Sequence, residues 1–314
     1  MSDQWGLLPP SRTYNRAFML IDKTRLARIL LFITPALWAV NYIVAKAAIG
    51  HIEPHALALL RWSIALLLML PFSYRELADK WPQWAAEWKE MFFLGACGMW
   101  ICGAFVYIGA KTTAAINIAL LYAIAPVLIA SVSAVWFHEK LRLRQWLGGA
   151  LALAGMLLII SKASWATFTH LSFTVGDWWI VAAVVSWTFY TLVLKNKSSC
   201  LSVFSRSTVI TLGGVLLLIP LTVIEMTMFG FPSRVDEKAL VLGVIAALVP
   251  GFAAYQAYSF MQSELGAAKA GIVLYLGPLY GALTGYLFLN EQPQLFHFVG
   301  AALILPGVYF ATKE

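Results

Sequence analysis

The stretch WAVNYIVAK, Trp38 to Lys46, recurs in outline as WTFYTLVLK, Trp187 to Lys195. Each copy begins with a Trp, continues through a polar or aromatic middle, and reaches a Lys inside otherwise apolar sequence. The two copies are 149 residues apart, and Pro71 precedes Pro220 by the same interval. A pattern that returns at a fixed interval indicates a repeated structural unit.

A longer match relates residues 125–155 to residues 277–307, at an interval of 152 residues. The matched pairs are Pro126 with Pro278, Glu139 with Glu291, Gly148 with Gly300, and Gly155 with Gly307. A length change of three residues between the two matches explains the two intervals. The chain is therefore interpreted as a tandem duplication.

The composition is that of a membrane protein. Hydrophobic residues make up 61% of the 314 residues and charged residues only 12%, about half the usual charged share of a soluble domain. A soluble protein of this size would need more charge to cover its surface. The thirteen Trp and twelve Tyr residues fit an aromatic belt at the membrane interface or a ligand cavity.

The apolar residues form ten blocks whose lengths suit transmembrane helices. The predicted spans are 26–49, 55–73, 90–110, 114–137, 143–162, 175–195, 203–228, 238–261, 267–289 and 295–312. No stretch alternates as a barrel strand would. We therefore predict a tail at 1–25, a first five-helix repeat at 26–162 and a second at 175–312. Because five is odd, the second repeat enters the membrane from the opposite side, which is typical of secondary transporters.

The distribution of Lys and Arg predicts the orientation. Fifteen lie in the N-terminal tail, the predicted inner loops and the C-terminus, against four in the outer loops. This asymmetry favours a multi-pass protein of the inner or plasma membrane with both termini in the cytoplasm. The first block is too long for a signal peptide and is expected to be retained. The net charge of +7 is spread along the loops, so we expect no nucleic-acid partner.

The sequence contains none of the catalytic or metal-binding motifs that were sought. Three cysteines give no disulfide framework, and the five histidines are scattered at loops and span ends, which suggests no metal site. There is no HExxH, no GxSxG and no intramembrane Asp pair. We expect no catalytic residues and no cofactor. Ring-like charge filters are also missing, so a channel is less favoured than a carrier.

Several motifs resemble a known family. They are ALWAVNYIVAK, LLRWSIALLLMLP, APVLIASVSAVWFHEKL and GPLYGALTGYLFLNEQ, followed by GGALALAG and GAALILPG in the last span of each repeat. Over residues 28–312 the chain resembles the drug/metabolite transporter superfamily, in its EamA-type branch. Family members export amino acids, metabolites or drugs, and relatives carry nucleotide sugars and triose phosphates. The resemblance implies a ten-helix carrier whose first, third, fourth, sixth, eighth and ninth spans line a cavity.

The candidate substrate-binding residues are polar or aromatic and lie at mid-membrane depth in those spans. They are Trp38, Asn41, Tyr42, Trp100, Tyr107, Asn117, Tyr122, Trp187, Tyr190, Tyr255, Gln256 and Tyr275. Buried amides and phenols need partners, which a wet cavity or a ligand would supply. The alternative is hydrogen bonding between helices, or aromatic rings that face lipid.

The candidate gating residues are two prolines and three basic residues. Pro126 and Pro278 are expected to kink their spans as a symmetric hinge. Lys46 and Lys195 fall at opposite mouths of the molecule, where they either gate or reach the headgroups as anchors. Arg61 could draw in a carboxylate, or could pair with a carbonyl or with Glu53. No Asp or Glu lies at the bilayer centre, which weakens proton coupling and strict cation selectivity.

The function predicted is export of small amphipathic metabolites, amino acids first and hydrophobic drugs second, by alternating access. The alternatives are a nucleotide-sugar or organophosphate exchanger and a membrane-embedded enzyme. An organophosphate site would need two or more basic residues in the cavity, and only Arg61 and Lys269 come close. The expected partners are a small-molecule substrate and the lipid bilayer, and a monomer would suffice.

Overall fold

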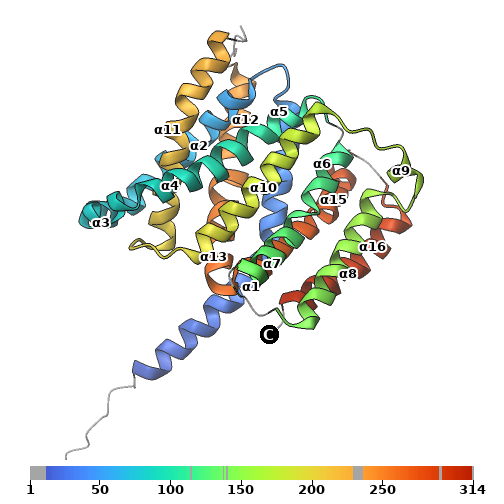
Figure 1. Ribbon diagram of the computed structural model, residues 1–314, viewed down its shortest axis with the longest axis horizontal. Helices are drawn as coiled ribbons and strands as arrows, with labels where there is room; N and C mark the ends of the chain where they lie inside the picture. Colours follow the sequence, from blue (N-terminus) through green and yellow to red (C-terminus); the bar gives the residue numbers. More distant parts are fainter. Residues whose placement is uncertain are drawn as a thin grey trace, which may run out of the picture.

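The computed structural model describes residues 12–113, 115–136, 138, 141–228, 236–289 and 292–312. Side chains are described from Lys23 onward, except at positions 42, 46, 115, 116, 284, 285, 288 and 289. All regular structure in these residues is helical (Figure 1). Nine of the described helices are long and apolar enough to cross a membrane, and a further apolar helix at 267–283 is shorter. The chain is thus an all-α protein with the helix lengths that a bilayer requires.

The first half of the chain contains five of these nine stretches. Its elements are α1 (Arg12–Ala47), α2 (Pro54–Asp79), α3 (Trp81–Ala86), α4 (Trp88–Gly95), η1 (Ala96–Phe105), α5 (Val106–Ala110), α6 (Ala115–Tyr122), α7 (Ala125–Trp136), α8 (Leu143–Ile160) and α9 (Ala166–Thr169). Helix α1 begins well before the predicted start at residue 26, and α4, η1 and α5 together form the third span.

The second half repeats this plan. Its elements are α10 (Val175–Asn196), α11 (Val203–Met228), α12 (Glu237–Ala246), η2 (Ala247–Ala253), α13 (Ala254–Leu265), α14 (Ala267–Gly271), η3 (Ile272–Leu276), α15 (Gly277–Leu289) and α16 (Leu295–Thr312). Here α12, η2 and α13 form one long stretch, as α4, η1 and α5 do in the first half.

Irregular turns fall at matching places in the two halves. The third span contains a wide π-helical segment, η1, and the eighth contains another, η2, at the position that the 149-residue interval gives. The predicted span 114–137 is interrupted between α6 and α7, and the predicted span 267–289 contains the 3₁₀ segment η3. Segments of this kind mark departures from the regular hydrogen-bond ladder and often lie at functional sites.

The two paired prolines lie in the first turns of α7 and α15. Pro126 is the second residue of α7, and Pro278 is the second residue of α15. Proline has no backbone N–H, and the first turn of a helix is where that N–H is not needed. Each proline therefore follows an irregular turn of its span, and the role of the pair as a hinge stays a prediction.

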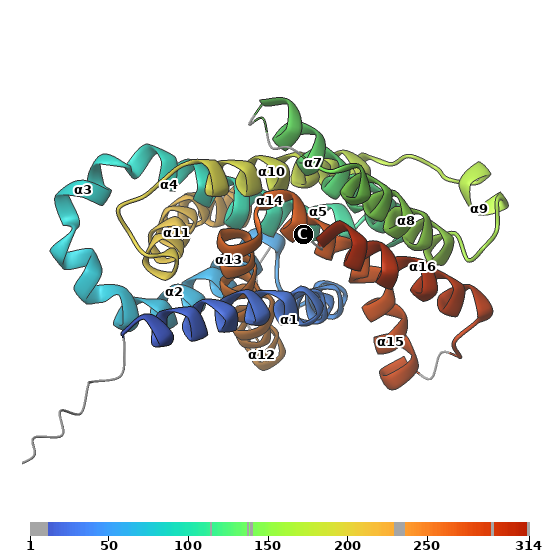
Figure 2. The same cartoon turned by 90° about the horizontal axis from the view of Figure 1, so that it is seen from below.

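Equivalent helices of the two halves pack against each other. Helix α8 packs along α16, and α2 along α11, and these two pairs lie toward opposite ends of the molecule (Figures 1 and 2). Helix α1 packs on α13, and its counterpart α10 packs on η1, the equivalent of that region in the first half. The pairs α8 with α16 and α2 with α11 each join a helix of one half to its counterpart in the other half.

Matched glycines bring α8 and α16 into backbone contact. A Cβ on Gly148 would lie 2.6 Å from the carbonyl oxygen of Gly307, and a Cβ on Gly155 would lie 2.7 Å from that of Gly300. No side chain fits at such distances, so only glycine allows this approach. Since Gly148 meets the later residue and Gly155 the earlier one, the two helices run antiparallel.

A pair of matched glutamates holds α2 and α11 together in the same antiparallel sense. Glu76, near the end of α2, accepts hydrogen bonds from the N–H of Ser202 (2.8 Å) and its Oγ (2.6 Å), just before α11 begins. Glu225, near the end of α11, accepts from the N–H groups of His55 (2.9 Å) and Ala56 (3.3 Å) at the start of α2. Each carboxylate caps the other helix, where the helix dipole favours negative charge. The interval between these two glutamates is again 149 residues.

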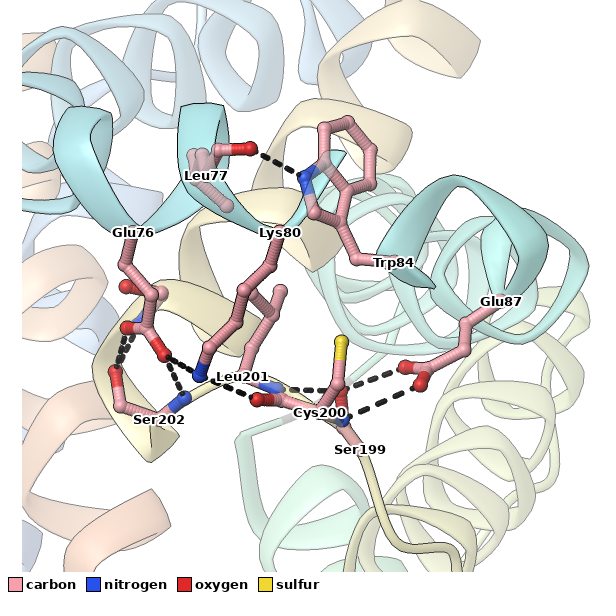
Figure 3. Close-up of polar contacts among 10 residues, drawn as sticks. Glu76, Leu77, Lys80, Trp84, Glu87, Ser199, Cys200, Leu201 and Ser202 are labelled. Atoms are coloured by element: carbon pink, nitrogen blue, oxygen red, sulfur yellow. Dashed lines mark hydrogen bonds and ion pairs between the residues drawn. The ribbon is translucent and has the colours of Figure 1, made fainter. Parts of the chain in front are cut away.

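The contacts around Glu76 extend into a network on the predicted cytoplasmic face (Figure 3). The ammonium of Lys80 contacts Glu76 Oε1 at 2.8 Å and donates to the carbonyl of Cys200 at 2.7 Å. Glu87 accepts from Ser199 Oγ at 2.6 Å. The segment after α2 is thereby fastened to the segment before α11, which joins the first half to the second on this face.

Candidate functional site

Aromatic side chains from both halves meet at the centre of the molecule. Trp38 of α1 and Trp187 of α10 lie edge to face, and Tyr190 stacks on Trp187 with ring centroids 5.3 Å apart. Tyr258 lies 5.3 Å from Trp38 and 5.0 Å from Trp187. Tyr255 contacts the ring of Trp62 at 4.7 Å. These six rings are called the aromatic cluster below, and aromatic pairs of this kind contribute about 0.5–1.5 kcal/mol each beyond their area.

A small cavity opens beside the aromatic cluster. Its volume is about 90 Å³, which holds several waters but is below the roughly 300 Å³ at which drug-sized ligand pockets begin. It is lined by Trp38, Asn41, Arg61, Cys102, Val106, Tyr122, Trp187, Tyr255 and Leu274. The lining comes from α1, α2, η1, α5, α6, α10, α13 and η3, so both halves of the chain form the walls.

Arg61 supplies the positive charge of this cavity. Its Nη1 donates to Asn41 Oδ1 and to the hydroxyl of Tyr107, both at 3.2 Å, and Nη2 donates to the carbonyl of Pro250 at 2.9 Å. The Tyr107 hydroxyl in turn donates to Asn41 Oδ1 at 2.7 Å. The Cζ atom lies 4.6 Å from the centre of the Trp62 ring, a cation–π distance. Of the two structural partners considered for Arg61, the carbonyl is present, whereas Glu53 pairs with Lys111 at 2.6 Å.

The π-helical turn of the eighth span supplies that carbonyl. Pro250 lies inside η2, where its ring excludes the regular hydrogen bond to the preceding turn. Carbonyls in such a turn are not all used within the helix, and that of Pro250 reaches Arg61. Nothing in the sequence relates Pro250 to an arginine 189 residues away, so this contact required the fold.

Five of the twelve predicted binding residues line the cavity. They are Trp38, Asn41, Tyr122, Trp187 and Tyr255. Tyr107 and Tyr190 contact residues of the lining: Tyr107 accepts a hydrogen bond from Arg61, and Tyr190 stacks on Trp187. The side chain of Tyr42 lies outside the described residues, as do those of Lys46, Glu139 and Glu291. The side chain of Lys195 is half-buried near the end of α10.

Four predicted residues lie elsewhere. Asn117 donates to the carbonyl of Ser172 (3.0 Å) and to Asp177 Oδ2 (3.2 Å). Gln256 donates to Ser207 Oγ at 3.0 Å. Both amides hydrogen-bond between helices, which was the alternative considered. Tyr275 lines a separate groove of about 250 Å³ together with Lys269.

Trp100 takes part in a polar cluster near the start of α2. Its Nε1 donates to His55 Nε2 at 3.4 Å, and His55 Nδ1 lies 2.8 Å from Glu225 Oε1. His55 therefore links Trp100 in η1 to Glu225 near the end of α11.

Sequence reasoning missed three residues of the lining. Cys102, Val106 and Leu274 are apolar or weakly polar, and they were not among the predicted binding residues. Cys102 could have been identified from its place in the third span, one of those that the family resemblance directs toward a cavity. Leu274 carries no such indication, because leucine is equally common on lipid-facing surfaces.

Comparisons with known proteins agree with one another. The model of the EamA-like transporter family matches the chain twice, over residues 25–161 and 174–313. An uncharacterized transporter of Archaeoglobus fulgidus is 24% identical over 91% of this chain and 97% of its own length. A protein of Streptantibioticus cattleyicolor, named a probable terminal-alkyne amino-acid exporter, is 24% identical over 90% of this chain and 92% of its own length.

The fold is also found among solved structures. One crystal structure superposes with a TM-score of 0.69 and 18% sequence identity, covering 91% of this chain and 97% of that one. At this identity the likeness concerns the fold alone. The nine apolar helices among the described residues and the match to a transporter family support an all-α integral membrane protein.

Proposed function

We propose that this chain, which belongs to the EamA-like transporter family, is a secondary transporter that exports small amphipathic metabolites such as amino acids. The observation that carries the proposal is the central cavity, whose walls come from both halves and include the equivalent residues Trp38 and Trp187. Secondary transporters built from inverted repeats place their site between the halves near the midplane.

The proposed transport cycle uses the two five-helix halves, 26–162 and 175–312, as inverted repeats that rearrange around the cavity. The interruptions before Pro126 and Pro278 supply a matched pair of hinges, because irregular turns resist bending less than continuous helix does. Both termini are placed in the cytoplasm, on the distribution of Lys and Arg. The protein acts as a carrier and not as an enzyme, in keeping with relatives named as transporters.

Amino acids are the first substrates to test. The cavity combines aromatic faces, an amide and a guanidinium, which suits a small molecule with an apolar part and a charged part. The relative named a probable amino-acid exporter supports this choice. An organophosphate exchanger is less favoured, because Lys269 lines the groove with Tyr275 and not the central cavity.

The test is counterflow of labelled amino acids in proteoliposomes that contain the purified protein. A thermal-stability screen selects the compounds, since a ligand present at 100 times its Kd stabilises by about 2.7 kcal/mol. We expect amino acids to exchange, and we expect Trp187→Ala to lose exchange. Trp178→Ala is the matched control, because Trp178 belongs to the same helix but is 65% exposed.

Two results would contradict the proposal. Exchange of phosphorylated sugars without exchange of amino acids would favour the organophosphate alternative. Equal loss of exchange in Trp187→Ala and Trp178→Ala would show that the cavity is not the site.

A further inference from the structure

Arg61 is a charged side chain held almost entirely out of solvent. Only 3% of its surface is exposed, and its Cζ lies 4.6 Å from the ring centre of Trp62 and 5.9 Å from that of Tyr255. It lies in α2, within a stretch long and apolar enough to cross a membrane. A cation in such a place is costly unless an anion accompanies it.

The hydrogen-bond partners of Arg61 are all neutral. They are the amide oxygen of Asn41, the hydroxyl of Tyr107 and the carbonyl of Pro250. Among the described residues, no carboxylate forms an ion pair with this guanidinium. The acidic residues nearest to Arg61 in the sequence form ion pairs with other residues, Glu53 with Lys111 and Glu76 with Lys80. The positive charge is therefore uncompensated within the described part of the chain.

The cavity also has donors without acceptors. Of the five N–H groups of a guanidinium, three are used, and Nε is buried without a partner. A Cβ on Gly251 would lie 3.4 Å from Nε, so the backbone of this glycine lies close to that nitrogen. The indole Nε1 of Trp187, which also lines the cavity, is likewise buried without a partner. Two buried donor atoms, Arg61 Nε and Trp187 Nε1, and one cation without an ion-pair partner favour an acceptor that carries negative charge.

We propose that Arg61 binds the carboxylate of the transported metabolite, so that the substrates are small monocarboxylates, amino acids among them. The inference rests on the transport function proposed above and names its substrate class. A planar carboxylate matches the fork of a guanidinium, whereas a phosphate dianion would need a second cation. The apolar part of the substrate lies against Trp38, Trp187 and Tyr255, and the 90 Å³ volume favours short chains.

The test compares an acid with its uncharged isostere. The ligands are 4-methylpentanoate, 4-methylpentanamide and leucine, which share one carbon skeleton, and their binding to the purified full-length protein is measured by calorimetric titration. We expect the acid and leucine to bind at least tenfold more tightly than the amide. Equal binding of the acid and the amide would overturn the proposal without the use of any variant.

Two variants locate the anion at Arg61. Arg61→Lys retains the positive charge but loses the two parallel N–H donors of the guanidinium. It is expected to weaken binding of the acid about tenfold. Asn41→Asp places a carboxylate where Arg61 already donates, and is expected to abolish the preference for the acid over the amide while the fold is retained. Arg206→Lys is the control, because Arg206 is also buried but is paired with Glu90 at 2.6 Å. Undiminished binding of the acid by Asn41→Asp would overturn the proposal, even if Arg61→Lys failed to fold.

This proposal and the transport function can fail separately. Tight binding of the acid without counterflow of any compound would support the carboxylate site and contradict the transport function. Counterflow of compounds that lack a carboxylate, at rates unaffected by Asn41→Asp, would support transport and overturn the carboxylate site.

Discussion

Trp38 and Trp187 occupy equivalent positions in the two halves of the chain, and their ring centroids are 5.4 Å apart with an interplanar angle of 87°. A residue that contacts its own counterpart lies on or near the axis that relates two repeats. The two tryptophans that begin the repeated motif therefore mark the centre of the molecule, and the cavity beside them lies at the junction of the halves.

The first prediction concerns this pair. In a double-mutant cycle with Trp38→Leu and Trp187→Leu, we expect a coupling energy of about 0.5–1.5 kcal/mol, because each substitution removes the same edge-to-face contact. The free energy of unfolding is measured by denaturant titration in mixed micelles. Trp165→Leu, at a side chain that is 79% exposed, should change stability by less than about 0.5 kcal/mol. Strict additivity of the two substitutions would contradict the contact.

The second prediction concerns the two glutamates that cap helices across the halves. Glu76→Gln and Glu225→Gln are each expected to lower stability by about 1–2 kcal/mol, because the carboxylate at the start of the neighbouring helix is lost. The measurement is the same titration. Glu264→Gln removes an exposed carboxylate within α13 and should have little effect. Similar stability of all three variants would argue against the capping role.

The third prediction uses two adjacent glycines in α8. A Cβ on Gly148 would meet backbone of α16 at 2.5–2.6 Å, whereas a Cβ on Gly149 would meet nothing within 4 Å. Gly148→Ala is therefore expected to destabilise by about 1–3 kcal/mol through overpacking. Gly149→Ala should be neutral or stabilising by about 0.5–1 kcal/mol, because alanine is the better helix former. Equal effects of the two substitutions would show that α8 and α16 are further apart.

The fourth prediction concerns pH at the predicted external face. The hydrogen bond from His51 lowers the pKa of Asp236, with help from the N–H of Ala239. A group whose pKa is lower in the folded state stabilises the protein above its ordinary pKa, and this contribution is lost as the pH falls through the folded value. The difference in thermal stability between the wild type and Asp236→Asn should therefore be constant at neutral pH and shrink below about pH 4. A difference that persists unchanged into strong acid would contradict this assignment.

The fifth prediction tests the orientation. Cys200 lies on the face where α2 ends and α11 begins (Figure 3), and burial together with Glu87 raises the pKa of its thiol. Labelling with a membrane-impermeant maleimide is therefore carried out at mildly alkaline pH, where more thiolate forms. We expect labelling in inside-out vesicles and none in right-side-out vesicles, and no labelling at this site in Cys200→Ser. The reverse pattern would place the termini outside.

Much of the candidate site could be predicted because polar groups are rare in apolar helices. Asn41, Tyr122 and Arg61 stand out in such sequence and do line the cavity. Asn117 and Gln256 stand out equally but hydrogen-bond to neighbouring helices. Nothing in the sequence distinguishes the two outcomes, because an amide in hydrocarbon is satisfied equally well by another helix or by a wet cavity.

The hinge prediction shows a different limit. The interval of 152 residues paired Pro126 with Pro278, and the structure interrupts both spans close to them. Whether a proline kinks a helix or begins one depends on whether the preceding turn is retained. That in turn depends on contacts from other helices, which a single sequence does not contain.

The sequence by itself determined the helical class and the repeat interval of the chain, because both can be read from the order of residue types without knowing how the helices pack. A bilayer requires apolar stretches of fixed length, and matched residues such as Trp38 and Trp187 keep their spacing whatever the packing. Only the tertiary structure decided that these two rings touch, that Pro250 holds Arg61, and that the charge of Arg61 has no described carboxylate beside it. These are contacts between residues far apart in the chain, and their existence depends on how the helices cross.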